Sequence, residues 1–148
     1  MGRRTALLFL ERLIAEYAQA FDRHDEALLR SIWHEYALLS LGDACGNFEG
    51  VEAILGSARQ NWQTMPHMHH WMANPLIDIA GDTATGPAAV DCLCAHVEMG
   101  PMQISGLCHD RFERRDGRRA FVERRFDLHF LTPLTNWTPV ACSESVKP

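Results

Sequence analysis

Residues 102–131 read MQISGLCHDRFERRDGRRAFVERRFDLHFL, and this stretch decides which fold the sequence predicts. Two long runs with strand character, 102–115 and 118–131, flank the dipeptide Asp116-Gly117. Asp-Gly between two such runs favours a two-residue β-hairpin turn, because both turn residues need a positive φ. The stretch therefore predicts a long antiparallel hairpin.

Two further strand-like runs precede the hairpin, at about 67–79 and 83–99. The connections that we expect are Ala80-Gly81-Asp82 and Gly100-Pro101, so the last half of the chain is predicted to be a meander of four long strands. Shorter strand-like segments are expected near 36–41 and 46–50.

Apolar residues recur at helical spacing in three segments upstream of the meander. The first helix is predicted over about 5–21, and a shorter one follows Asp25, which can cap it, and extends through Trp33. The third is predicted over about 51–62. Helices followed by an antiparallel sheet indicate an α+β fold in one domain, 1–148, with 1–4 and about 138–148 as flexible or surface-wrapping ends.

The composition restricts the classes of partner. The net charge is -5 and 47% of the residues are hydrophobic, which favours a globular domain and gives no sign of a nucleic-acid or membrane partner. Five scattered cysteines without a zinc-binding framework are typical of reduced cytosolic thiols, and Cys92 and Cys94 are interpreted as packing residues on one strand face. We find no targeting segment, and a cytoplasmic location is expected.

Asp22 and His70 are the first candidates for chemistry. Asp22 ends the apolar face of the first helix, where an isolated buried carboxylate is costly and a histidine is a natural partner. A carboxylate on one imidazole nitrogen leaves the other nitrogen free to act as a base. The residues alone leave two alternatives open: a helix-end aspartate that caps a backbone amide, and a surface histidine.

Six motifs resemble the SnoaL-like families of the NTF2-like superfamily, which include scytalone dehydratases, bile-acid 7α-dehydratases, hexachlorocyclohexane dehydrochlorinases and polyketide cyclases. They cover most of the chain from about Leu10 to Leu134: FDRHD (21–25), SIW (31–33), NFEGVEAI (47–54), HHWMAN (69–74), FERRDG (112–117) and FLTPL (130–134). The resemblance implies a cone-shaped curved antiparallel sheet packed on three N-terminal helices, of the cystatin-like α+β barrel type, with an apolar pocket inside.

The eliminating members use an Asp–His dyad, which the motifs carry onto Asp22 and His70, 48 residues apart. A strand arginine that assists in the dehydrochlorinases corresponds to Arg124. Tyr17 stands where those enzymes have a lysine, which puts dehalogenation in doubt, and the bile-acid dehydratases have a tyrosine there. Tyr17 could also be a core aromatic residue, and Arg124 could instead pair with Glu113 or Glu123.

The remaining candidates are residues expected to line the substrate pocket. Met68, Met72 and Asn74 share a strand face with His70, whereas His67 and His69 face the other way. The pocket residues predicted are Met68, Met72, Asn74, Trp33, His109 and His129.

The predicted activity is that of a hydro-lyase without cofactor or metal, in which His70 removes a proton from an apolar, aromatic or steroid-like cyclic substrate. An isomerase or polyketide-type cyclase would use the same base, and a non-catalytic ligand-binding domain is the alternative from another class. A homodimer or homotrimer is expected, because an open sheet face needs cover.

Overall fold

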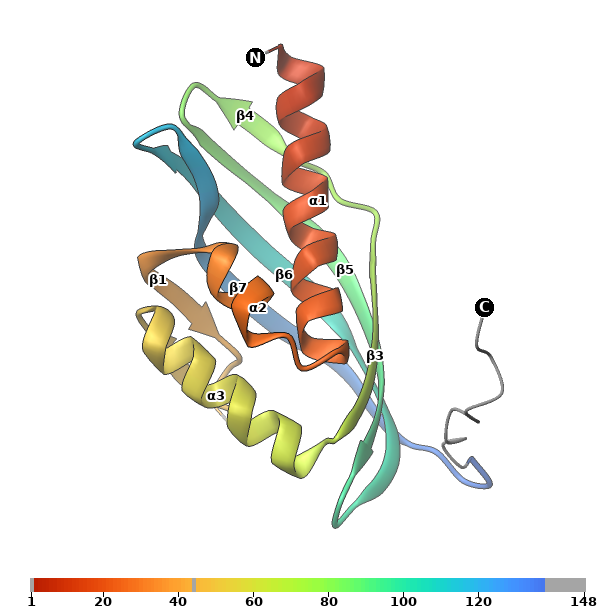
Figure 1. The fold of residues 1–148 in the computed structure, drawn as a ribbon. Coiled ribbons are helices and arrows are strands. Elements are labelled where there is room, and N and C mark those ends of the chain that lie inside the picture. Colours follow the sequence, from red (N-terminus) through yellow and green to blue (C-terminus); the bar gives the residue numbers. More distant parts are fainter. Residues whose placement is uncertain (1, 44, 138–148) are drawn as a thin grey trace, which may run out of the picture.

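The structure is a computed structural model that describes residues 2–43 and 45–137, and it contains three helices against a curved sheet (Figure 1). The predicted α+β class is confirmed. The helices are α1 (Arg3–Asp22), α2 (Glu26–Ser31) and α3 (Val51–Thr64). The strands are β1 (Trp33–Ser40), β2 (Asn47–Glu49), β3 (His67–Ala73), β4 (Asp78–Ala80), β5 (Thr83–His96), β6 (Gly100–Arg115) and β7 (Arg118–Pro133).

The described strands form one sheet in the order β2-β1-β7-β6-β5-β3, with β4 paired to β5. Strands β3, β5, β6 and β7 are antiparallel neighbours, and β1 joins β7 in parallel. The predicted hairpin is confirmed, since Asp116 and Gly117 both have a positive φ (51° and 76°) between β6 and β7. The ladder is bulged between Arg111 and Phe112 and between Ser105 and Gly106, and bulges bend and twist a sheet locally.

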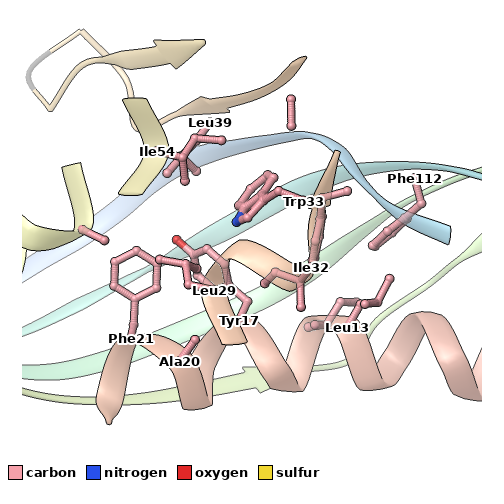
Figure 2. Packing of buried hydrophobic residues seen from close by; sticks show 14 of the residues in the cluster. Leu13, Tyr17, Ala20, Phe21, Leu29, Ile32, Trp33, Leu39, Ile54 and Phe112 are labelled. Atoms are coloured by element: carbon pink, nitrogen blue, oxygen red, sulfur yellow. The ribbon is translucent and has the colours of Figure 1, made fainter. Parts of the chain in front are cut away.

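The core lies between α1 and the concave side of the sheet (Figure 1). Figure 2 shows Tyr17 and Phe21 of α1 packed toward Trp33, the first residue of β1. The ring centroid of Tyr17 lies 4.8 Å from that of Phe21 and 6.2 Å from that of Trp33. This aromatic packing fixes the rotation of α1, and with it the direction in which its last residue, Asp22, points.

Several predicted boundaries differ from the structure. Helix α2 is capped by Asp25 as predicted, through Leu28 N–H at 2.9 Å, but it ends at Ser31 because Trp33 already belongs to β1. The run 67–79 is interrupted at Asn74, which has a φ of 51° and precedes Pro75, and it forms the two strands β3 and β4.

Two further corrections concern a turn and the chain ends. The turn between β5 and β6 is Val97–Met99, and Gly100 and Pro101 already belong to β6. Arg3 and Arg4 are helical, whereas the predicted C-terminal end, 138–148, lies outside the described residues. None of the helices in the described ranges is both long and apolar enough to cross a membrane.

The close packing at the Gly106 bulge predicts that a larger residue there will destabilise the protein. A Cβ at this position would lie 2.1 Å from the carbonyl oxygen of Asp127 and 2.6 Å from the Phe126 ring, so the backbone of β6 or β7 must move. We expect Gly106→Ala to lower the free energy of unfolding by about 3 kcal/mol, the upper range for overpacking, as measured by urea denaturation.

Gly56→Ala is the matched control for this substitution. Gly56 lies inside α3 and is exposed, and a Cβ added to it would meet no other atom within 4 Å. Alanine there should stabilise the protein by about 0.5–1 kcal/mol through helix propensity. Equal effects of the two substitutions would contradict the role of the bulge.

Candidate active site

Asp22 and His70 meet where the end of α1 crosses β3. Asp22 Oδ1 lies 2.6 Å from Nδ1 of the His70 ring, and Asp22 Oδ2 accepts the backbone N–H of His70 at 2.9 Å. The side chains of His70 and Asp22 are 12% and 14% exposed, so the pair is largely enclosed.

Asp22 is held in an otherwise unfavourable place. A carboxylate at the last residue of a helix faces the negative end of the helix dipole. The two N–H groups of His70 offset this repulsion, and Trp62 of α3 fixes the adjoining backbone by donating to the Phe21 carbonyl at 3.0 Å. The helix end and β3 are therefore joined directly by one side chain.

The hydrogen bonds of Asp22 define the tautomer of His70. An ionised carboxylate only accepts, so the Nδ1 that it contacts carries a proton. In the neutral imidazole the lone pair then lies on Nε2, for which no protein hydrogen-bond partner is found in the described part of the chain. Residues 22 and 70 thus have the arrangement of an oriented general base.

Arg124 is fully buried and forms a two-fold ion pair. Its Nε and Nη2 donate to Oδ1 and Oδ2 of Asp110, both at 2.7 Å. The expected alternatives for Arg124, Glu113 and Glu123, are therefore corrected to Asp110. Burial alone would lower the pKa of Arg124, but the Asp110 carboxylate outweighs it and the pKa is raised, so the guanidinium stays charged.

Tyr17 lies between this ion pair and the dyad. The Arg124 guanidinium carbon is 4.1 Å from the centre of the Tyr17 ring, whose edge-on neighbour, at 6.4 Å between centroids, is the His70 ring. Burial raises the pKa of Tyr17 above its ordinary value of 10.0, and the Arg124 charge opposes this only in part. Tyr17 is therefore a protonated hydrogen-bond donor rather than a base.

Two buried donors beside Tyr17 have no partner within the described residues: Nη1 of Arg124 and the indole Nε1 of Trp33. Trp33 and Arg124 both pack on Tyr17 and Phe121, and in Figure 2 the indole nitrogen and the Tyr17 hydroxyl point into the same space. A buried donor without an acceptor costs about 1–3 kcal/mol. The arrangement is suited to a ligand that brings acceptor atoms.

The other sequence-predicted residues divide between two faces. Met68 and Met72 are half-buried beside His70 in β3, while His67 and His69 are exposed on the opposite face, as the alternation predicts. Asn74 lies beyond the end of β3 with a left-handed backbone and is exposed.

The two remaining histidines are not brought to the dyad. His109 lies on the outward face of β6, where its Nε2 is 2.9 Å from Oδ2 of the exposed Asp127, and His129 is exposed in β7. Two surface hollows of about 380 and 270 Å³ also lie away from the dyad. His109 lines the larger and His69 the smaller, and neither is lined by Asp22 or His70.

The buried ion pair can be tested by its effect on stability. Asp110→Asn leaves the Arg124 charge buried without a counter-charge, and we expect a loss of about 3–5 kcal/mol in the free energy of unfolding, measured by urea denaturation. Asp110→Asn/Arg124→Met should regain most of it. Asp127→Asn, in the exposed pair with His109, is the control and should cost no more than about 1 kcal/mol.

Comparison with known proteins identifies the family of the chain. The SnoaL-like domain model matches residues 6–125. The gamma-hexachlorocyclohexane dehydrochlorinase of Sphingobium indicum is 27% identical over 128 residues, which cover 84% of this chain and 81% of the relative. A crystal structure of a type 2 hexachlorocyclohexane dehydrochlorinase superposes with a TM-score of 0.89 at 24% identity, covering 95% and 96% of the two chains. A scytalone dehydratase-like protein from Novosphingobium aromaticivorans superposes with a TM-score of 0.79 at 17% identity, covering 88% of each chain. The chain belongs to the SnoaL-like domain family.

Proposed function

We propose that this protein is a cofactor-independent lyase, a dehydratase that removes water from a small apolar cyclic substrate with His70 as the general base. The observation that carries the proposal is the double hydrogen bond from His70 to Asp22, which orients the ring and leaves Nε2 free. An oriented histidine of this kind contributes about 10²–10⁴-fold to a proton transfer.

The reaction starts with a C–H bond next to a carbonyl or similar activating group. Nε2 of His70 takes the proton, and Asp22 stabilises the resulting imidazolium without itself becoming protonated. The electron pair of the C–H bond forms the new double bond as the C–O bond to the leaving hydroxyl breaks. Hydrogen-bond donors at the other end of the site stabilise the negative charge that develops on the substrate's oxygen atoms.

The unpartnered donors support a substrate that carries oxygen. Arg124 offers Nη1 of its charged guanidinium, and Trp33 offers Nε1, so two acceptor lone pairs are accommodated near the Tyr17 hydroxyl. The pocket side of β3 is otherwise apolar, with Met68 and Met72 half-buried there. A ring with an activating oxygen and a hydroxyl matches these surroundings.

Tyr17 favours loss of water over loss of chloride. Hydroxide is a poor leaving group that needs a proton, whereas chloride leaves without one. The raised pKa of Tyr17 means that its hydroxyl carries a proton at neutral pH. Tyr17 donates this proton to the leaving oxygen as the C–O bond breaks, and then recovers one from the His70 imidazolium by way of solvent. The dehydrochlorinase relatives act on hexachlorocyclohexane, and this chain is proposed to use the same kind of base on an oxygen leaving group.

A homodimer or homotrimer in the cytoplasm completes the proposal. Leu128, Phe130 and Leu131 are 50–68% exposed in the outer part of β7, where no other described strand pairs with its free edge. Apolar side chains on an open strand edge favour coverage by another copy. Light scattering on the purified full chain gives the mass that decides this point.

The dyad predicts a specific loss of activity. With a panel of apolar cyclic β-hydroxy ketones, the wild-type protein should produce conjugated enones, followed by ultraviolet absorbance and by loss of one water in the mass spectrum. His70→Ala and Asp22→Asn should lower kcat/KM by about 10²–10⁴-fold.

His67→Ala is the matched control, because His67 is an exposed histidine on the opposite face of the same strand. Its kcat/KM should be unchanged. A product isomeric with the substrate would replace dehydration by isomerisation, and loss of hydrogen chloride from chlorinated rings without dehydration would contradict the leaving-group assignment. Ligand binding unaccompanied by turnover would favour a non-catalytic domain.

Tyr17 predicts a particular pH profile. Because its pKa is raised, the hydroxyl stays protonated at and above its ordinary value of 10.0, and kcat should show no decline from Tyr17 ionisation up to about pH 10. Tyr17→Phe should lower kcat by roughly 10²-fold with the pH profile unchanged in shape. An alkaline limb below pH 10 that disappears in Tyr17→Phe would overturn the proton-donor role.

A further inference from the structure

A cluster of sulfur-bearing side chains lies next to the dyad and, apart from Met68 on the pocket side of β3, has no role in the reaction proposed above. Cys92, Cys94 and Met102 are buried together, and Met65, Met68 and Ile104 pack against them. Five of these six side chains carry sulfur, and we call those five the sulfur cluster. Cys92 and Cys94 were predicted to be packing residues, and their burial agrees with that interpretation.

The strand register explains why the sulfur atoms gather. Met68 of β3 opposes Cys94 of β5, and Cys94 in turn opposes Met102 of β6, so three sulfur side chains form one row across three strands. Directly opposed residues share a face, with Cβ atoms about 4.5–5.5 Å apart. Cys92 lies two residues before Cys94 on the same face, so a second thiol lies beside this row, in the neighbouring row with His70 and Ile104.

The two cysteines of the sulfur cluster, Cys92 and Cys94, are free thiols and do not form a disulfide. Residues two apart on an extended strand have Cα atoms about 6.6–6.8 Å apart, at the far limit for a disulfide. Both thiols therefore keep their sulfur atoms available. Met65 and Met68 are only half-buried, so the cluster can be reached from outside.

We propose that the sulfur cluster binds a soft monovalent metal ion, Cu(I), through the thiolates of Cys92 and Cys94 and the thioethers of Met68 and Met102. Thiolate and thioether ligands select Cu(I) over harder ions. No three His, Cys, Asp or Glu side chains within residues 2–43 and 45–137 converge on a metal position, so the donor set does not suit zinc or calcium.

The binding step is a simple exchange of a proton for a metal ion. Each thiol that binds releases its proton to solvent as its sulfur bonds to the ion, and the metal enters as Cu(I) and stays Cu(I). No oxidant or reductant is consumed. Methionine side chains have three rotatable bonds beyond the backbone, so their sulfur atoms can close around the ion without moving the strands.

A bound ion would lie beside the catalytic pair, because Cys92 is directly opposed by His70 in the β3–β5 ladder. The ring protons of His70 therefore report occupancy independently of any enzymatic activity. Cu(I) is diamagnetic, so the His70 resonances, identified by their loss in His70→Ala, should shift on binding without broadening away.

The experiment titrates the full chain with Cu(I) under nitrogen against a coloured Cu(I) chelator. The wild-type protein should withdraw one Cu(I) per chain. Met68→Leu and Met102→Leu keep side-chain volume and should each weaken binding by about tenfold or more. Cys92→Ala/Cys94→Ala should abolish it. Circular dichroism and the unfolding midpoint show whether each variant is folded.

Two controls make the test specific. Met72→Leu changes a methionine on the same face of β3 that packs in the main core instead, and should leave Cu(I) affinity unchanged. Cys45→Ser removes an exposed thiol that is not part of the cluster and should also leave it unchanged. The proposal is overturned if the cysteine-free cluster still binds, if Met68→Leu and Met102→Leu bind as tightly as the wild type, or if His70 resonances do not move.

Discussion

The structure depends on one carboxylate that accepts two hydrogen bonds. Asp22 ends α1 at the unfavourable end of the helix dipole, and the ring and backbone N–H groups of His70 are what make that position tolerable. The same contact fixes α1 against β3 and orients the imidazole. Orientation of the base and docking of the helix are therefore a single interaction, and a substitution that disturbs one must disturb the other.

The sequence predicted those parts of the fold that local chemistry determines. The helical spacing of α1 and α3, the Asp25 cap and the Asp116-Gly117 turn each depend on a few adjacent residues. The predicted strand boundaries were wrong where backbone sterics interrupt a continuous strand-like pattern, as at Asn74-Pro75 between β3 and β4. The parallel pairing of β1 with β7 connects segments about 85 residues apart, so it could not be predicted from patterns among adjacent residues.

The partner of Arg124 could not be found by counting from the turn. With a regular two-residue hairpin, Phe112 opposes Phe121, and the next pairs would place Asp110 against Glu123, two like charges. The bulge beyond Phe112 inserts one residue, so that Asp110 opposes Arg124 instead. Extra residues of this kind leave no clear mark in the sequence. The one-residue shift turns the guanidinium inward onto Tyr17 and leaves Arg125 outside.

The candidate site therefore has two ends, a basic pole and a donor pole, which arise from different features of the fold. The basic pole, His70 with Asp22, follows from the end of one helix and the alternation of one strand, and both signals are present in the sequence. The donor pole, Arg124 with Trp33, follows from a bulge and from aromatic packing around Tyr17. A buried charge paired on one side and unpaired on the other is stable only at a cost, which a ligand oxygen would offset. The unpaired donors thus argue for a substrate with oxygen at the end remote from His70. The sequence predicted Arg124 and Trp33 as site residues, but not the Asp110 partner that holds Arg124 in place.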